Sequence, residues 1–350
     1  MAETIKVREG EDFDRKAVEE YLRRHIEGLP EGSLEVEQFP SGASNLTYLL
    51  RIGSWEGVLR RPPLGPVPPK AHDMERESRL LTRLNPVYPL APKPYFYCED
   101  RSVIGAPFYV MERRRGIVID DSFPEGMEPT PELCSGISET LCDTLVGLHA
   151  VDYQAAGLGD LGHPEGFLER QVGGWISRYE RAKTGEIPEV GPLTRWLASD
   201  IPESPPPTII HNDYKLNNLI LDPEDPTEVR AVLDWEMATV GDPLFDLAVS
   251  LSYYVEKDDP PEIKRVLPTV TDAPGFMTRE EFMQRYAEKS GRDLSRMHWY
   301  RVFGYFKLAV ILQQIYVRWV RGQTKDERFA TFGDRVKNLI LYAYSLSRSS

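Results

Sequence analysis

The chain has 350 residues, of which 41% are hydrophobic and 28% charged, and this balance excludes wholesale disorder. Its 55 acidic residues outnumber its 42 basic ones and give a net charge of −13. Such a charge argues against nucleic acid as a partner, because phosphate backbones repel an acidic protein. The length is enough for two domains of ordinary size, with cores that need no disulfides.

The three cysteines, Cys98, Cys134 and Cys142, are widely spaced. They form neither a disulfide framework nor a paired zinc motif, so we expect a reducing, cytoplasmic setting. The N-terminal segment has no apolar run of the signal-peptide type, and no segment reaches the ~18 consecutive apolar residues of a transmembrane helix. We therefore expect no membrane partner, and the sequence leaves the oligomeric state open.

The first third of the chain alternates between helical and β patterns. Apolar spacing predicts a helix over residues 12–27. Residues 46–52 and 57–61 flank a Gly-Ser-Trp-Glu turn and are typical of a β-hairpin. A second helix is predicted over residues 71–85 and a buried strand over 106–113.

Beyond residue 115 the apolar spacing is mainly helical. Amphipathic helices are predicted over residues 130–150 and 164–182, and the stretch 279–348 is again helical. The chain therefore begins with a small sheet carrying an inserted helix and continues as a larger helical part. This order predicts an α+β fold.

The segment 208–248 carries the clearest chemistry. Two short apolar strands surround a Pro- and Asp-rich turn, which predicts a hairpin. If the hairpin is centred near Pro226, Asn218 and Asp234 lie side by side at its open end. His211 and Asp213 enter the same end from just upstream.

Carboxylate and amide oxygens are hard ligands that suit Mg²⁺, which in turn binds phosphate oxygens. A further carboxylate that stays off the metal can accept a proton from an attacking hydroxyl. His211, Asp213 and Asn218 also fill the H-x-D-x-x-x-x-N spacing of a kinase catalytic loop. The segment therefore predicts phosphoryl transfer, which needs mainly positioning and charge neutralisation.

On these residues the chain resembles the aminoglycoside phosphotransferase family, also called choline-kinase-like or protein-kinase-like phosphotransferases. The subgroup it most resembles is the kinase-like domain that some acyl-CoA dehydrogenases carry. The blocks SGASNLTYLL, VLRRPP, AHDMERESRLL, APFYVMERRRG, FLERQVGGW and HNDYKLNNLI have counterparts there in the same order. The resemblance implies a bilobal fold, with a nucleotide-binding N-terminal lobe over residues 1–113 and a helical catalytic lobe over 114–350.

The resemblance implies a role for each residue of the catalytic segment. Asp213 would be the catalytic base, and His211 would brace its loop. Asn218 and Asp234 would hold Mg²⁺. Lys215 would touch the γ-phosphate, the alternative being an exposed charge. The acids at positions 242 and 246 would steady the loop and the helix that follows, the alternative being helix caps and surface acids.

The N-terminal lobe would hold ATP or GTP. Its phosphate loop would include Ser41, Gly42, Ser44 and Asn45, although this loop is poor in glycine and is also compatible with a plain turn. The lysine expected on the third strand is replaced by Arg60, with Glu77 as its partner and Glu75 as the alternative. An arginine still offers positive charge and several donors to phosphates. Met111 and Arg113 would belong to the hinge segment that meets the base.

The acceptor site is less defined by the sequence. Trp235 and Glu236 directly follow the proposed metal ligand, and Tyr305 lies on a C-terminal helix. All three are candidates to line the substrate cleft, although aromatic residues on helices usually belong to the core.

The implied activity is transfer of the γ-phosphate to a hydroxyl of a small molecule, such as a metabolite, a hydroxyacyl compound or an aminoglycoside-like compound. The alternative is a catalytically weak nucleotide-binding module with a regulatory or interaction role, suggested by the glycine-poor loop and Arg60. A metal-dependent hydrolase is disfavoured because the six histidines are scattered. Protein kinase activity is disfavoured because no A-P-E block follows Asp234.

Overall fold

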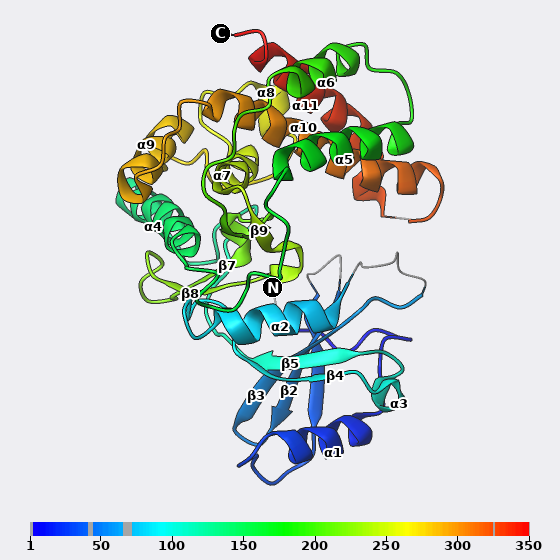
Figure 1. The fold of residues 1–350 in the computed structure, drawn as a ribbon. Coiled ribbons are helices and arrows are strands. Elements are labelled where there is room, and N and C mark those ends of the chain that lie inside the picture. Colours follow the sequence, from blue (N-terminus) through cyan, green and yellow to red (C-terminus); the bar gives the residue numbers. More distant parts are fainter. Residues whose placement is uncertain (1–2, 41–44, 66–71, 325, 350) are drawn as a thin grey trace. The chain divides into compact units, whose positions relative to one another are not determined.

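We analysed a computed structural model of the chain (Figure 1), which describes residues 3–40, 45–65, 72–324 and 326–349. The chain divides into two compact units. Unit 1 comprises residues 1–116 together with 230–236, and unit 2 comprises 117–229 together with 237–350. The short segment 230–236, which contains Asp234, therefore belongs to unit 1 although the chain around it belongs to unit 2.

Unit 1 is built on a five-stranded antiparallel sheet with the strand order β1-β2-β3-β5-β4. Its strands are β1 (Glu35–Gln38), β2 (Leu46–Ile52), β3 (Trp55–Arg61), β4 (Pro94–Cys98) and β5 (Phe108–Glu112). The expected hairpin is the β2–β3 pair, in which Ile52 faces Trp55. The central strands β2, β3 and β5 are largely buried, because each packs its apolar residues into the core of the unit.

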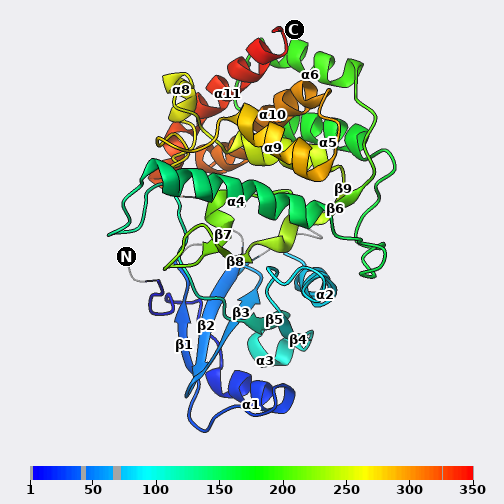
Figure 2. The same cartoon turned by 90° about the vertical axis from the view of Figure 1, so that its left-hand side faces the viewer.

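Three helices accompany this sheet: α1 (Arg15–His25), α2 (Met74–Leu84) and α3 (Arg101–Ile104). Helix α1 begins where Asp14 accepts a hydrogen bond from the N–H of Ala17, and it packs Val18 and Leu22 into the core beneath β2 and β3. Helix α2, capped by Asp73, packs beside β4 and β5 (Figure 2). The helices predicted over residues 12–27 and 71–85 are thus present, with shorter bounds.

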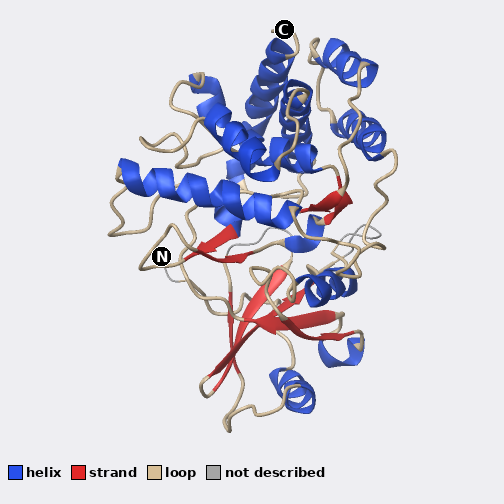
Figure 3. Cartoon of the chain, turned by 60° about the vertical axis from the view of Figure 1, so that its left-hand side comes forward, coloured by secondary structure: helices blue, strands red, loops and turns tan. Residues whose placement is uncertain are grey.

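Unit 2 is mainly helical (Figure 3). Its helices are α4 (Pro131–His149), α5 (Phe167–Ala182), α6 (Val190–Ser199), α7 (Pro243–Ser252), α8 (Pro261–Lys264), α9 (Arg279–Ser290), α10 (Met297–Val320) and α11 (Phe332–Leu346). Every residue of α7 is buried, and the long helix α10 packs against α5, α7 and α11. Helices α7 and α10 therefore form the centre of this unit.

Short strands connect this helical core to the catalytic segment. Strand β6 (Thr208–Ile210) pairs antiparallel with β9 (Thr239–Gly241), so the loop that begins at His211 lies beside the start of α7. Strands β7 (Leu219–Leu221) and β8 (Val229–Val232) pair as the predicted hairpin, and the boundary between the units falls inside β8. The N–H of Asp222 donates to the carbonyl of Glu228 at 2.9 Å, so the turn is centred at Asp225, one residue before the position we predicted.

These elements confirm the predicted α+β class, with an antiparallel sheet in the N-terminal part and a helical remainder. Among the helices that the structure describes, none combines the length and apolar character needed to cross a membrane. All three cysteines are buried and free.

Helix α10 touches α7 closely at Gly304, where a Cβ atom would lie 2.6 Å from the carbonyl oxygen of Ala248. We predict that Gly304→Ala lowers the free energy of unfolding by about 1–3 kcal/mol, because the two helices must separate to accept the methyl group. Urea denaturation of purified protein measures this change.

The matched control is Gly173→Ala in α5, where an added Cβ would have no neighbour within 4 Å. This substitution is expected to raise the free energy of unfolding by roughly 0.5–1 kcal/mol, because alanine loses less conformational freedom in a helix than glycine. Equal effects of the two substitutions would contradict the close α7–α10 contact.

Candidate active site

A buried carboxylate fixes the backbone of the predicted catalytic loop. Asp246 lies in the first turn of α7 and has no exposed surface. Its Oδ2 accepts the backbone N–H of His211 at 2.7 Å, and its Oδ1 accepts the N–H of Asn212, also at 2.7 Å. The two oxygens of one carboxylate therefore hold two successive peptide groups directly before Asp213.

Asp246 is itself held by His149, the last residue of α4. The Nε2 atom of His149 lies 3.1 Å from Oδ2 of Asp246, and its Nδ1 lies 2.7 Å from the hydroxyl of Tyr286. Burial acts to raise the pKa of Asp246, but the hydrogen bond and charge of His149 outweigh it and keep that pKa below its usual range. Asp246 is thus an anion under the loop, and the steadying role expected for it has a structural basis.

The residues predicted to be catalytic lie close together in unit 2. The Nζ atom of Lys215 lies 3.0 Å from Oδ2 of Asp213 and sits 4.8 Å from the ring centre of Tyr253. The side-chain amide of Asn218 donates to the backbone carbonyl of Asp213 at 2.8 Å and to its Oδ2 at 3.3 Å. The H-x-D-x-x-x-x-N spacing therefore gathers a carboxylate, an ammonium and an amide around one point.

His211 lies beneath this group. Its side chain is fully buried, and its Nδ1 accepts the backbone N–H of Asp213 at 3.3 Å. Such a contact supports the loop from inside the protein, without exposure to solvent. The geometry is consistent with the bracing role that the sequence suggested for His211.

In unit 1 a single arginine contacts three carboxylates. Arg60 on β3 lies 2.9 Å from Glu77 of α2, 3.0 Å from Asp234 and 3.8 Å from Glu236. Both Arg60 and Glu77 are buried. The side chain that α2 directs toward Arg60 is thus Glu77, and Asp234 shares the same guanidinium.

This crowding shifts the ionisation of the group. Burial raises the pKa of Glu77 to about 7, with Arg60 opposing and the charges of Asp234 and Glu236 contributing. Although burial disfavours the charged form of Arg60, its carboxylate neighbours keep its pKa well above the usual range. The cluster therefore holds a permanent cation beside an excess of acidic groups.

A further network ties Glu236 to the start of β2. The amide of Asn45 donates to Oε2 of Glu236 at 2.7 Å, and Oδ1 of Asn45 lies 2.9 Å from Nδ1 of His72. Arg76 of α2 donates to the backbone carbonyl of Glu236 at 3.2 Å. The other predicted phosphate-loop residues, Ser41, Gly42 and Ser44, lie outside the described residues.

The predicted hinge residues lie at the end of β5. Met111 is buried within the sheet, opposite Val58. The guanidinium of Arg113 lies 5.1 Å from the ring centre of Phe39 and pairs with Glu3. Their contact with a nucleotide base stays a prediction.

Two residues predicted to contact the acceptor are buried in the core instead. Trp235 is 1% exposed, donates its ring N–H to the carbonyl of Val232 and packs against Tyr88. Tyr305 is 2% exposed and packs edge-on against Tyr342. Both rings fill hydrophobic space, because large aromatic side chains gain most from burial.

The donor atoms fit the implied magnesium ion. The amide nitrogen of Asn218 is engaged by Asp213, which leaves its oxygen as the ligand atom. The carboxylate of Asp234 adds a second hard oxygen donor, as Mg²⁺ prefers. Because Asn218 belongs to unit 2 and Asp234 to unit 1, their shared binding of one ion stays a prediction.

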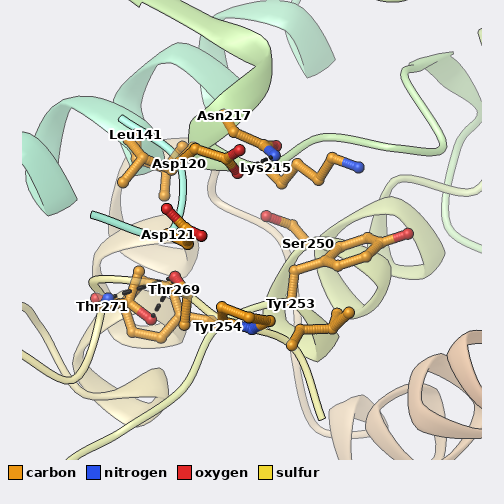
Figure 4. Close-up of a pocket in the computed structure, with 13 residues that line it drawn as sticks. Asp120, Asp121, Leu141, Lys215, Asn217, Ser250, Tyr253, Tyr254, Thr269 and Thr271 are labelled. Atoms are coloured by element: carbon orange, nitrogen blue, oxygen red, sulfur yellow. Dashed lines mark hydrogen bonds between the residues drawn. The ribbon is translucent and has the colours of Figure 1, made fainter. Parts of the chain in front are cut away.

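A cavity of about 260 Å³ opens beside Lys215 within unit 2. Figure 4 shows that Lys215, Asn217 and Asp120 line one part of it, with Asp121 and Tyr253 around the rest. The amide of Asn217 donates to Asp120 at 2.7 Å. The remaining lining residues are Leu141, Leu216, Ser250, Tyr254, Leu267, Pro268, Thr269 and Thr271. The cavity therefore offers carboxylates, hydroxyls and aromatic surface to a small polar molecule.

Several residues in these networks were not predicted from the sequence, and three of them support the proposed site most directly. His149 supports Asp246, His72 contacts Asn45, and Lys307 of α10 donates to the backbone carbonyl of Asn212 at 2.9 Å. Of these three, only Lys307 could have been noticed in the sequence, because it is the single charged residue in the apolar run 302–312.

We predict that Asp246→Asn lowers the free energy of unfolding by about 3 kcal/mol, because one of two buried N–H groups would then face an amide N–H. Since the pKa of Asp246 is lowered, the difference from the wild type should be present at neutral pH and shrink as acidification protonates the carboxyl. Chemical denaturation at several pH values measures both effects. The matched control is Glu132→Gln, an exposed acid in the first turn of α4, which is expected to change stability by under ~0.5 kcal/mol.

Comparison with known sequences shows what this chain is related to. A family model described as "Phosphotransferase enzyme family" matches residues 35–300. Acyl-CoA dehydrogenase family member 10 of Mus musculus is 34% identical over 98% of this chain, and family member 11 of Rattus norvegicus is 34% identical over 99%. The chain spans only 32% and 45% of the lengths of these two relatives.

Solved structures with the same fold include a putative aminoglycoside phosphotransferase from Ralstonia eutropha JMP134. It is 33% identical, with a TM-score of 0.82 and coverage of 96% of this chain and 99% of that one. A thermostable mutant of aminoglycoside phosphotransferase APH(4)-Ia, in a ternary complex with ADP and hygromycin B, is 15% identical, with a TM-score of 0.59 and coverage of 95% and 98%. Choline kinase from Cryptosporidium parvum is 14% identical, with a TM-score of 0.60 and coverage of 95% and 98%.

The similarity to the last two structures shows the fold alone. The family model and the Ralstonia structure are similar to this chain in sequence as well. Together with the H-x-D-x-x-x-x-N loop built around Asp213, they show that this chain belongs to the phosphotransferase enzyme family that includes the aminoglycoside phosphotransferases.

Proposed function

We propose that the chain transfers the γ-phosphate of ATP or GTP to a hydroxyl group of a small molecule. The observation that carries this proposal is the geometry of the catalytic loop, where Lys215 and Asn218 lie within hydrogen-bonding distance of Asp213. A buried anion, Asp246, holds the same loop from below. Catalytic loops of phosphotransferases need this kind of preorganisation, because most of their catalysis is positioning and charge stabilisation.

In the proposed reaction Asp213 accepts the proton of the attacking hydroxyl. Lys215 and the side-chain amide of Asn218 both contact Oδ2 of its carboxylate, and we assign proton acceptance to Oδ1. The ammonium of Lys215 stabilises negative charge on the transferred phosphoryl group. Asn218 and Asp234 would hold Mg²⁺, which supplies positive charge to the phosphate oxygens.

Unit 1 supplies the residues proposed for nucleotide binding. Arg60 is a buried cation of this unit that contacts Glu77 and Asp234, and we assign it the role that a lysine has in many kinases. The Asn45–Glu236 hydrogen bond ties the end of the predicted phosphate loop to the segment that carries Asp234. A structural neighbour that holds ADP together with hygromycin B supports a fold able to bind donor and acceptor at once.

We propose that the acceptor binds in the cavity beside Lys215, since the cavity lies next to the side chain that contacts Asp213. Its volume of about 260 Å³ suits a small molecule or the end of a larger one. The relatives are named as acyl-CoA dehydrogenases and the structural neighbours include aminoglycoside phosphotransferases and a choline kinase. The acceptor classes to test are therefore hydroxyacyl compounds, hydroxylated metabolites, amino alcohols and aminoglycosides.

The test is a screen for Mg²⁺-dependent consumption of ATP and of GTP in the presence of each acceptor class, with product formation followed by mass spectrometry. Phosphorylation of any acceptor supports the proposal. Binding of nucleotide without transfer to any acceptor would favour a nucleotide-binding module with a regulatory or interaction role. Absence of both binding and transfer would overturn both readings.

We predict that Asp213→Ala lowers turnover by about 10²–10⁴-fold, because the hydroxyl then loses its proton acceptor. Nucleotide binding in the presence of Mg²⁺ should survive, since Asp213 is not assigned to the metal. Asp258→Ala, which removes an exposed aspartate of the same unit, is the matched control and should retain activity. Full turnover in Asp213→Ala would remove Asp213 from the proposed mechanism.

We predict that Asp234→Ala weakens binding of the magnesium–nucleotide complex by at least about 10-fold, because loss of a metal ligand should cost no less than loss of a residue that only orients one. Calorimetry with and without Mg²⁺ separates this effect from a loss of nucleotide contacts, since metal-free binding should change little or improve. An unchanged affinity in the presence of Mg²⁺ would count against the metal assignment.

A further inference from the structure

Lys307 is a buried lysine in the middle of α10. Its side chain is 3% exposed, and it stands alone as a charged residue in the apolar run 302–312. Lysines are among the residues least often buried, because removing an ammonium from water is costly. A helix that needed only packing at this position would carry methionine or leucine instead.

The surroundings of Lys307 join three helices to the catalytic loop. Its Nζ atom donates to the backbone carbonyl of Asn212 at 2.9 Å. The same atom lies 5.1 Å from the ring centre of Phe245 on α7 and 5.6 Å from that of Trp175 on α5. The hydrogen bond thus goes to a peptide carbonyl, and the aromatic faces provide the rest of the environment for the cation.

The charge of Lys307 is sensitive to pH near neutrality. Burial lowers its pKa to about 8, with Asp213 and Asp246 opposing this shift and Arg178 and Lys215 adding to it. These groups come from the catalytic loop, from α7 and from α5. Lys307 is therefore mostly a cation at pH 7 and becomes neutral as the pH rises through about 8.

Asn212 is held by three hydrogen bonds, at its backbone N–H, its backbone carbonyl and its side-chain NH₂ group. Its backbone has a φ of 67°, a left-handed conformation that asparagine tolerates better than most residues. Its N–H donates to Asp246 and its side-chain amide to the carbonyl of Met237 at 2.9 Å. Its carbonyl is the acceptor for Lys307.

The carbonyl of Asn212 and the N–H of Asp213 belong to the same planar peptide group. A hydrogen bond that fixes the carbonyl therefore also fixes the direction of the N–H and the position of the Asp213 Cα atom. The N–H of Asp213, at the opposite edge of this peptide group, donates to Nδ1 of His211 at 3.3 Å. Lys307 and His211 thus hold opposite ends of the peptide that carries the proposed base.

We propose that Lys307 is a positioning residue for phosphoryl transfer, which orients the Asn212–Asp213 peptide so that the Asp213 carboxylate meets the acceptor hydroxyl. This inference rests on the proposed function, since it assumes that Asp213 takes part in the reaction. Lys307 contacts the backbone of the loop and would affect the reaction only through the position of Asp213. The loop backbone is thus held by hydrogen bonds from two helices, from Lys307 on α10 and from Asp246 on α7.

The experiment compares Lys307→Met with Gln313→Met. Gln313 is the matched control, because it is another buried polar residue of α10 whose side chain donates to a backbone carbonyl, that of Ala182, at 2.8 Å. Turnover is measured with MgATP and an acceptor found by the screen, or with water as acceptor if the screen finds none. Thermal unfolding and calorimetric MgATP binding are recorded for each protein.

We expect Lys307→Met to bind MgATP like the wild type and to lose about 10- to 100-fold in turnover, because a small misplacement of a reacting group has effects of that size. Gln313→Met should keep its turnover. Equal turnover of Lys307→Met and the wild type, or equal losses in both variants, would overturn the proposal.

The dependence of turnover on pH separates a positioning role from a purely structural one, because loss of packing alone would not change that dependence. Wild-type turnover should fall as the pH rises through about 8, where the ammonium of Lys307 loses its proton. The low residual turnover of Lys307→Met should lack this alkaline limb, whereas Gln313→Met should show it. An alkaline limb that persists in Lys307→Met would assign it to another group and contradict the inference.

Amide hydrogen exchange keeps the test decisive if the wild type transfers no phosphate. In Lys307→Met, exchange at the N–H groups of Asn212 and Asp213 should be faster than in the wild type by about 10-fold or more, because local opening of the loop is less costly. Gln313→Met should leave these amides unchanged. If the wild type is inactive, faster exchange in Lys307→Met would still support the role of Lys307 in holding the loop, although the proposed function would fail. Unchanged exchange would refute that role.

Discussion

The carboxylate of Asp246 is the interaction on which the catalytic loop depends. It accepts two successive backbone N–H groups, from His211 and Asn212, and receives His149 as a third partner. A loop would not keep a left-handed residue directly before its reactive group without such a support, since that conformation costs free energy. The charge that stabilises the loop is thus stored in the helical core of unit 2, out of reach of solvent.

Unit 1 uses the opposite arrangement, in which one buried cation serves several anions. Arg60 contacts Glu77, Asp234 and Glu236, so the position of Asp234 depends on a residue of the central sheet. Asp234 has a left-handed backbone, with a φ of 68°, and its carboxylate is held by this arginine. In unit 1 Asp234 is therefore held by the buried cation of Arg60. In unit 2 the N–H of Asp213 is held by a buried acceptor, the Nδ1 atom of His211.

The parts of the site that follow from local spacing were predictable from the sequence. The spacing from Asp213 to Asn218 brings their side chains within hydrogen-bonding distance, and the turn residues of the hairpin predicted the strands on either side of it. Long-range partners were not predictable in this way. His149 lies 97 residues from Asp246 and Lys307 lies 95 residues from Asn212, so no periodic pattern connects them. Trp235 was assigned to a substrate cleft because it follows the predicted metal ligand, and Tyr305 because it lies on a C-terminal helix, yet tertiary packing buries both rings in the core.

The glycine at position 304 gains a further meaning from this arrangement. It lies one helical turn before Lys307 and allows the backbone of α10 to approach Ala248 of α7. Asp246 on α7 and Lys307 on α10 both form hydrogen bonds with the backbone of the same loop. The separation of the two helices therefore sets the distance between these two side chains. A residue without a side chain would then bear on the position of the catalytic loop as well as on the packing of the two helices.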